Sequence, residues 1–198
     1  MNVPIILAST SRIRRQILAA AGVEFEIVRP DVDEVLITSK GLGDGLSLDA
    51  VTQRLADAKA LAPKAPAEAI VVGSDQMLEL GGRAHDKART LAEARARLLE
   101  MQGGSHALIN AVAAAREGRV VWRHLARSVI MMRRKTPAEI DAYLAACGEG
   151  VLASVACYEV EGLGSRLIER IEGDYFSVLG LSLFPLLGFL RAEGALPF

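Results

Sequence analysis

The amino-terminal segment, residues 3–21, constrains the fold most, because it joins an apolar stretch, a hydroxyl-rich turn and an arginine-rich helix. Residues 3–7 (Val-Pro-Ile-Ile-Leu) have the composition of a short buried strand, and a turn of small hydroxyl residues follows. Residues 11–21 predict a helix that ends at Gly22. A strand that leads through a turn into a helix indicates a fold that mixes both kinds of element.

The remainder of the chain continues this mixture. Helices are predicted over 47–62, 91–101, 137–146 and 179–193, and strands over 25–28, 69–73 with an extension over 77–80, 105–115, 119–132, 158–160 and 167–171. Residues 30–45 are polar, rich in glycine and acidic at their start, so they predict a loop. No repeat or clean linker interrupts the 198 residues, which predicts a single α/β domain over 1–198, at most divided into two closely joined lobes.

The composition excludes several classes of protein. A net charge of -1 and nine aromatic residues, none clustered beside basic ones, argue against a nucleic-acid-binding module. The longest apolar run, 176–190, has 15 residues and contains two glycines and a proline, whereas a membrane span needs about 20. Cys147 and Cys157 fit no zinc spacing and predict reduced thiols. Together with the absence of a cleavable leader, these features predict a cytoplasmic protein.

The turn and helix after the first strand have the chemistry of an anion site. Ser9 and Ser11 precede a helix start that carries Arg12, Arg14 and Arg15. Free backbone N–H groups and the helix dipole favour negative charge there, and arginine adds forked donors that match phosphate oxygens. The alternative from the residues alone is a capped helix with solvated arginines.

Acidic and basic residues elsewhere offer partners for such a site. Asp75 follows the apolar strand 69–73, where it either holds a divalent metal or a water, or stabilises a turn. Asp33 and Glu34 offer a second carboxylate, unless they are merely solvated. Lys59 and Lys87 either neutralise phosphate or are surface charges.

The familiar nucleotide and hydrolase motifs are absent. The sequence has no GxxxxGK[ST] loop, no GxGxxG that opens a helix after a strand, and no GxSxG elbow. The three histidines, His85, His106 and His124, lack metal-ligand spacing and are interpreted as structural.

The order of several short motifs resembles the Maf family of nucleoside triphosphate pyrophosphatases over nearly the whole chain. The family opening Ala-Ser-x-Ser-Pro-x-Arg-Arg corresponds to residues 8–15 and Leu-Ala-x-x-Lys-Ala to 55–60. The further matches are Gly-(Ala/Ser)-Asp at 73–75, Gly-Lys-Pro at 86–88, Leu-x-Gly-x-x-His at 101–106, and late elements at 161–164, 171–175 and 179–183. Each motif is weak alone, but their order is specific.

The resemblance implies a fold, a reaction and an assembly. The expected fold is α/β and similar to inosine triphosphate pyrophosphatase, with a mixed twisted sheet flanked by helices and two lobes around a central cleft. The expected reaction is cleavage between the α and β phosphates of a nucleoside triphosphate, which gives a monophosphate and pyrophosphate in a housecleaning role. The resemblance also implies a divalent metal (Mg²⁺, Mn²⁺ or Co²⁺), a homodimer, and neither nucleic acid nor membrane as a partner.

The resemblance also assigns roles by position. Asp75 and Glu34 are expected to hold the metal and, with Lys87, to act in catalysis, with Asp75 as the base or water-positioning group. The residues expected to bind substrate are Ser9, Arg14, Arg15, Lys59, Gln76 and Glu161.

The sequence departs from the family pattern in ways that affect the substrate. Arg12 replaces the family proline, and Ala153-Ser154 stand where dTTP- and UTP-type members carry Asp-Lys. Gln76 and residues 161–164 are more similar to the branch that acts on 7-methyl-GTP, so we expect a modified nucleotide in preference to dTTP. The alternative function is a non-catalytic nucleotide-binding regulator of cell division.

Overall fold

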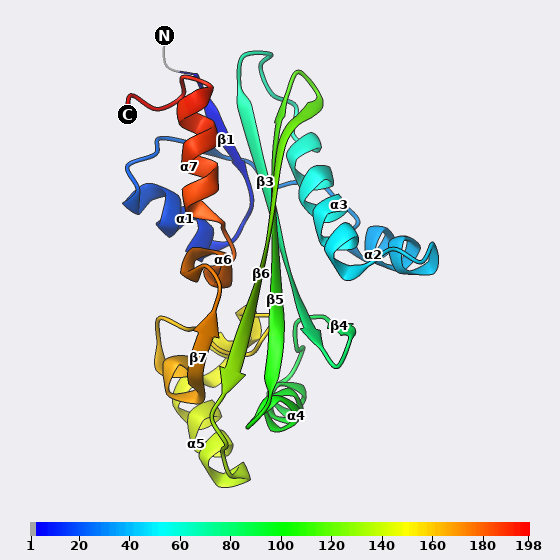
Figure 1. Cartoon of the computed structure of the whole chain (residues 1–198), viewed down its shortest axis with the longest axis vertical. Coiled ribbons are helices and arrows are strands. Elements are labelled where there is room, and N and C mark those ends of the chain that lie inside the picture. Colours follow the sequence, from blue (N-terminus) through cyan, green and yellow to red (C-terminus); the bar gives the residue numbers. More distant parts are fainter. Residues whose placement is uncertain (1–2) are drawn as a thin grey trace. The chain divides into compact units, whose positions relative to one another are not determined.

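The computed structural model describes residues 3–198 (Figure 1). The strands are β1 (Ile5–Ala8), β2 (Glu26–Ile27), β3 (Ile70–Leu80), β4 (Arg83–His85), β5 (Ser105–Arg116), β6 (Arg119–Met132) and β7 (Ile168–Glu172). The α-helices are α1 (Arg12–Ala20), α2 (Glu34–Gly43), α3 (Leu48–Leu61), α4 (Leu91–Met101), α5 (Pro137–Cys147), α6 (Tyr175–Leu179) and α7 (Leu183–Ala192). Two 3-10 helices, η1 (Gly148–Ala153) and η2 (Leu163–Leu167), complete the elements.

The strands form one mixed sheet, which confirms the predicted α/β class. Its order is β2-β1-β3-β5-β6-β7, and β4 pairs with β3 outside this path. β1 pairs in parallel with β2 and with β3, and the last pair in the second register is Ala8 with Gly73. β6 and β7 pair antiparallel, as do β3 and β4.

The chain divides into two compact units. The first unit contains the chain up to Gln76 together with Asn110–Ala126 and Gly180–Phe198. The second contains Met77–Ile109 and Arg127–Leu179.

One apolar cluster of the first unit is built mainly from small side chains, which allow close packing of α3 on β3. The buried residues of this cluster are Ile6, Ala8, Ala56, Ala60, Ala69, Val71, Ala111, Ala113 and Ala115. A Cβ atom at Gly73 would lie 2.4 Å from both the Ala56 oxygen and the Ala60 nitrogen. Only glycine permits this approach of helix to strand. Figure 1 shows α3 on one side of these strands, and α1 and α7 on the other.

The second unit packs its helices around a separate apolar core. Leu98 and Met101 of α4, Ile140 of α5 and Ile130 of β6 are buried in that core. α5 begins with the predicted capping box, in which Thr136 and Glu139 exchange hydrogen bonds between side chain and backbone. No helix within residues 3–198 is long and apolar enough to cross a membrane.

Four sequence predictions are wrong in detail. Residues 30–45 contain helix α2, which Asp33 caps by accepting from the Leu36 N–H at 2.9 Å. The two strand segments 69–73 and 77–80 are one strand, so Asp75 lies within β3 and not at its end. Residues 158–160 form no strand. The helix predicted over 179–193 begins only at Leu183, as α7, because a turn at Gly180 separates it from the short helix α6.

Candidate functional site

Three of the predicted residues meet in the first unit. The Lys59 Nζ lies 2.6 Å from Asp75 Oδ1 and 2.9 Å from Glu34 Oε1. The Lys59 and Asp75 side chains are 8% and 10% exposed, whereas that of Glu34 is 56% exposed. The two carboxylates predicted as metal ligands therefore share one buried ammonium, and Glu34 forms the solvent-facing side of the group.

Local structure explains how each member reaches this position. Glu34 is the first residue of α2, directly after the Asp33 cap. Lys59 lies in α3, which Ser47 caps as predicted by accepting from the Ala50 N–H. The pairing of β1 with β3 ends at Gly73, so Asp75 extends just beyond the carboxyl end of β1. This is the edge where α/β sheets collect ligands, although Asp75 itself is inside a longer strand.

The loop between β1 and α1 is held by hydroxyl groups. The buried Ser9 Oγ accepts from the Ser11 N–H at 3.2 Å and from Arg14 Nη1 at 3.4 Å. Arg14 Nη1 also donates to the backbone carbonyl oxygen of Ser74 at 2.9 Å, and Arg14 Nε donates to the carbonyl oxygen of Gly180 at 2.7 Å. The sequence predicts Arg14 as a phosphate ligand; in the structure its guanidinium joins α1 to β3 and to the turn before α7.

Electrostatics connect this loop with the carboxylates. Burial lowers the pKa of Arg14 because it disfavours the charged guanidinium, and the negative charges of Asp75 and Glu34 act in the opposite direction. Arginine remains a cation in proteins. Two cations, Arg14 and Lys59, thus balance two carboxylates within a small region.

Sequence reasoning missed one member of this region, Asn110 of β5. Its fully buried amide donates to the backbone carbonyl oxygen of Asp75 at 2.9 Å and to Ser74 Oγ at 3.3 Å. On its other side it accepts from the N–H and the hydroxyl of Ser182. The available signal was a single polar residue in the apolar run 107–115.

The other predicted site residues are spread over both units. In the first unit, Arg15 is half-buried in α1, and Gln76 is half-buried at the end of that unit's part of β3. In the second unit, Lys87 is exposed in the loop after β4, and Glu161 is exposed in the turn before η2. The structure brings Ser9, Arg14, Glu34, Lys59 and Asp75 together; the catalytic, metal-binding and substrate-binding roles of all nine residues remain predictions.

The donor set fits a divalent metal bound together with a substrate. Within residues 3–198 no group of three or more His, Cys, Asp or Glu side chains is arranged to hold a metal. Glu34 and Asp75 supply two carboxylates, and Mg²⁺ is commonly bound by one or two carboxylates together with water and substrate phosphates.

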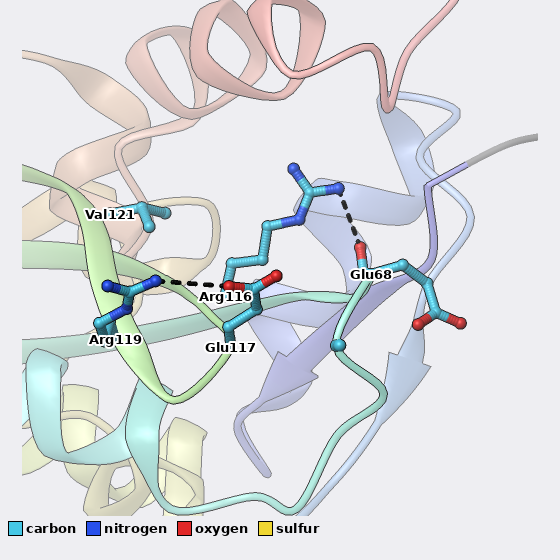
Figure 2. Close-up of a pocket in the computed structure, with 6 residues that line it drawn as sticks. Glu68, Arg116, Glu117, Arg119 and Val121 are labelled. Carbon is cyan, nitrogen blue, oxygen red and sulfur yellow. Dashed lines mark hydrogen bonds and ion pairs between the residues drawn. The ribbon is translucent and has the colours of Figure 1, made fainter.

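A separate pocket lies at the far end of the β5–β6 hairpin (Figure 2). It has a volume of about 470 Å³ and is lined by Ala67, Glu68, Arg116, Glu117, Arg119 and Val121. Arg116 donates to Glu193 and to the Glu68 oxygen, and Arg119 pairs with Glu117. None of the site residues predicted from the sequence lines this pocket.

Comparison with known proteins extends the similarity over the whole chain. A "Nucleoside triphosphate pyrophosphatase" of Hyphomonas neptunium is 43% identical over 197 residues, covering 100% of both chains. One from Caulobacter vibrioides is 45% identical over 193 residues, 98% of this chain and 97% of the relative. A "7-methyl-GTP pyrophosphatase" of Rhizobium meliloti is 41% identical over 193 residues, 97% of each chain.

The family described as Maf-like protein matches residues 4–193. This span includes both the loop of Ser9 and Arg14 and the shared ammonium of Lys59, so the site and the comparisons lead to one conclusion. The chain belongs to the Maf family.

Proposed function

We propose that this protein is a metal-dependent nucleoside triphosphate pyrophosphatase that acts on modified nucleotides. The relatives at 40–45% identity carry the names nucleoside triphosphate pyrophosphatase and 7-methyl-GTP pyrophosphatase, and both names describe a nucleotide pyrophosphatase. The observation that carries the proposal is the group in which Asp75 and Glu34 share the buried ammonium of Lys59. A site for nucleotide binding alone has no need for two carboxylates beside the phosphate-binding cations.

The charges suit a triphosphate only when further cations join the site. A nucleoside triphosphate carries about four negative charges near neutral pH, whereas Arg14, Lys59, Asp75 and Glu34 sum to zero. Glu34 and Asp75 are the residues that would hold a divalent metal, and such an ion, when bound, polarises phosphoryl oxygens and lowers the pKa of water.

The chain's own residues then have distinct tasks. In the proposed reaction a water oxygen bonds to the α phosphorus, and the bond from that phosphorus to the α–β bridging oxygen breaks. Asp75 accepts the proton that the water loses, while Lys59, at 2.6 Å, fixes the direction of that carboxylate. Ser9 and Arg14 orient the phosphates, and pyrophosphate leaves with the bridging oxygen.

The proposed substrate is a 7-methyl-GTP-like nucleotide and not dTTP or UTP. The Rhizobium meliloti relative carries the name 7-methyl-GTP pyrophosphatase, and two Brucella relatives at 40% identity share it. The sequence supports the same preference, because Ala153-Ser154 replace the Asp-Lys pair expected in the dTTP and UTP type. The homodimer remains a prediction from the family resemblance, and the cytoplasmic location remains a prediction from the thiols and the amino-terminal sequence.

Hydrolysis in ¹⁸O-labelled water tests the reaction and the substrate together. The enzyme is incubated with canonical and 7-methylated or otherwise modified triphosphates, with Mg²⁺, Mn²⁺, Co²⁺ or a chelator. We expect pyrophosphate and a monophosphate that carries the label, fastest with a modified nucleotide and abolished by the chelator. Release of a diphosphate and inorganic phosphate would refute the bond assignment, and a preference for dTTP would refute the substrate assignment.

A further inference from the structure

The amide of Asn110 uses its full hydrogen-bonding capacity in the interior of the first unit. Nδ2 donates to the backbone carbonyl oxygen of Asp75 at 2.9 Å and to Ser74 Oγ at 3.3 Å. Oδ1 accepts from the Ser182 N–H at 3.0 Å and from Ser182 Oγ at 2.8 Å. A side-chain amide offers two donor hydrogens and two lone pairs, so all four positions are occupied.

The orientation of this amide is fixed by its backbone partners. The Asp75 carbonyl only accepts, and the Ser182 N–H only donates, so the nitrogen of Asn110 must face Asp75 and its oxygen must face Ser182. A buried group at position 110 therefore has to donate on one side and accept on the other.

The same amide is connected by hydrogen bonds to Arg14. Ser74 Oγ, which accepts from Asn110, donates to the Gly180 oxygen at 3.0 Å. That oxygen also accepts from Arg14 Nε, while Arg14 Nη1 donates to the Ser74 oxygen. Gly180 has a φ of +103°, a conformation that side chains disfavour and glycine adopts readily, and these bonds hold the turn in that conformation.

We propose that Asn110 is a positioning residue that fixes the Asp75 carboxylate and the Arg14 guanidinium relative to each other. It bonds the backbone of Asp75 directly and reaches Arg14 through Ser74 and Gly180. Its role rests on the proposed pyrophosphatase function. Because the amide is fully buried and its hydrogen-bonding capacity is used within the protein, it acts on the reaction indirectly, through the geometry of Asp75 and Arg14.

The test variant is Asn110→Asp, which keeps the shape and the acceptor facing Ser182 but removes the donor facing Asp75. Outer residues that orient catalytic groups change activity by about tenfold to a hundredfold. At about pH 8 we expect kcat to fall by that factor, with KM within about threefold of wild type.

A pH profile separates this role from a purely structural one. The new carboxyl is buried, and burial raises the pKa of such a group. Once protonated, it again donates towards Asp75, so the ratio of variant to wild-type kcat is expected to rise as the pH falls from about 9 to about 6. Arg14, Lys59, Asp75 and Glu34 are the charged groups of the site, and they are present in both proteins, so the ratio isolates the new carboxyl.

Three matched variants complete the design. Asn110→Leu has no donor at any pH and is expected to lose activity without recovery. Asn110→Thr keeps one hydroxyl that both donates and accepts, and it is expected to retain several times the kcat of Asn110→Leu. Ser182→Ala removes one bond on the acceptor side only and is expected to stay within about threefold of wild type.

The outcomes distinguish the two proposals. Wild-type kcat in folded Asn110→Asp, or a ratio that does not change with pH, would overturn the positioning role. If Asn110→Asp does not fold, equal kcat in folded Asn110→Thr and Asn110→Leu would overturn it instead. A wild-type protein that releases no pyrophosphate in this assay would contradict the proposed function, independently of Asn110.

Discussion

Removal of the shared ammonium tests whether the site is held together as the structure shows. Lys59→Met keeps the length of the side chain but leaves the Asp75 carboxylate, 10% exposed, without its cation. Breaking a buried ion pair by removing one partner costs about 3 to 5 kcal/mol. The contact with Glu34 adds about 0 to 1 kcal/mol, because that carboxylate is 56% exposed and screened by solvent.

We therefore expect Lys59→Met to lower the free energy of unfolding by about 3 kcal/mol. With a urea dependence of about 3 kcal/mol per M for a chain of this size, the midpoint falls by about 1 M. The double variant Lys59→Met/Asp75→Asn removes both charges and is expected to recover most of this loss. Glu34→Gln is the matched control and is expected to change the free energy by less than about 1 kcal/mol.

The assay is urea unfolding without nucleotide or metal, followed by far-ultraviolet circular dichroism and by fluorescence. The single tryptophan, Trp122, stacks on Phe189 at 5.0 Å within the first unit and reports on that unit. A Lys59→Met midpoint equal to that of wild type would refute the reasoning. So would a double variant no more stable than the single one, because the loss would then not arise from the stranded Asp75 charge.

Two further predictions concern packing and pH. Gly73→Ala places a methyl group 2.4 Å from backbone atoms of Ala56 and Ala60, so we expect the free energy of unfolding in urea to fall by about 3 kcal/mol. Pyrophosphate release is expected to fall as well, because Lys59 moves with α3. Unchanged values would show that α3 is not held against β3. Burial lowers the pKa of His106 from 6.5 to about 4, so the unfolded chain binds the proton first. The contribution of His106 to the free energy of unfolding is intact above about pH 6.5 and falls by about 3 kcal/mol as the pH drops to about 4. His106→Gln does not titrate, so it is expected to flatten this part of the profile of unfolding free energy against pH. An unchanged profile would assign the loss to other groups.

Local signals predicted the parts of the fold that local chemistry determines. The helix over 47–62 begins where a capping serine predicts it, and the capping box predicted at Thr136 is present. Helix α2 was missed because part of its support is tertiary: Gly41 is buried against Val51 of α3, a contact that no local pattern reveals.

The site shows the same division. Residue types and the family resemblance named Asp75, Glu34 and Lys59 as members of the site, and the structure brings them together. The sequence could not show that Lys59 bridges the two carboxylates, because the contact joins three separate elements. The sequence also placed Asp75 at a strand end, because polar residues follow the apolar stretch 69–73, whereas β3 continues to Leu80.

In the proposed reaction Asp75 acts on the water, and Glu34, Arg14 and Lys59 remain to bind metal and nucleotide when Asp75 is neutralised. The most direct measurement compares wild type with Asp75→Asn in two assays on the same folded protein, pyrophosphate release and nucleotide binding by calorimetry. We expect the rate of pyrophosphate release to fall by about a thousandfold, while the dissociation constant for nucleotide stays within about fivefold of wild type. Undiminished release by Asp75→Asn would contradict it, as would a wild-type protein that binds nucleotides without hydrolysing them, which would favour a nucleotide-binding regulator.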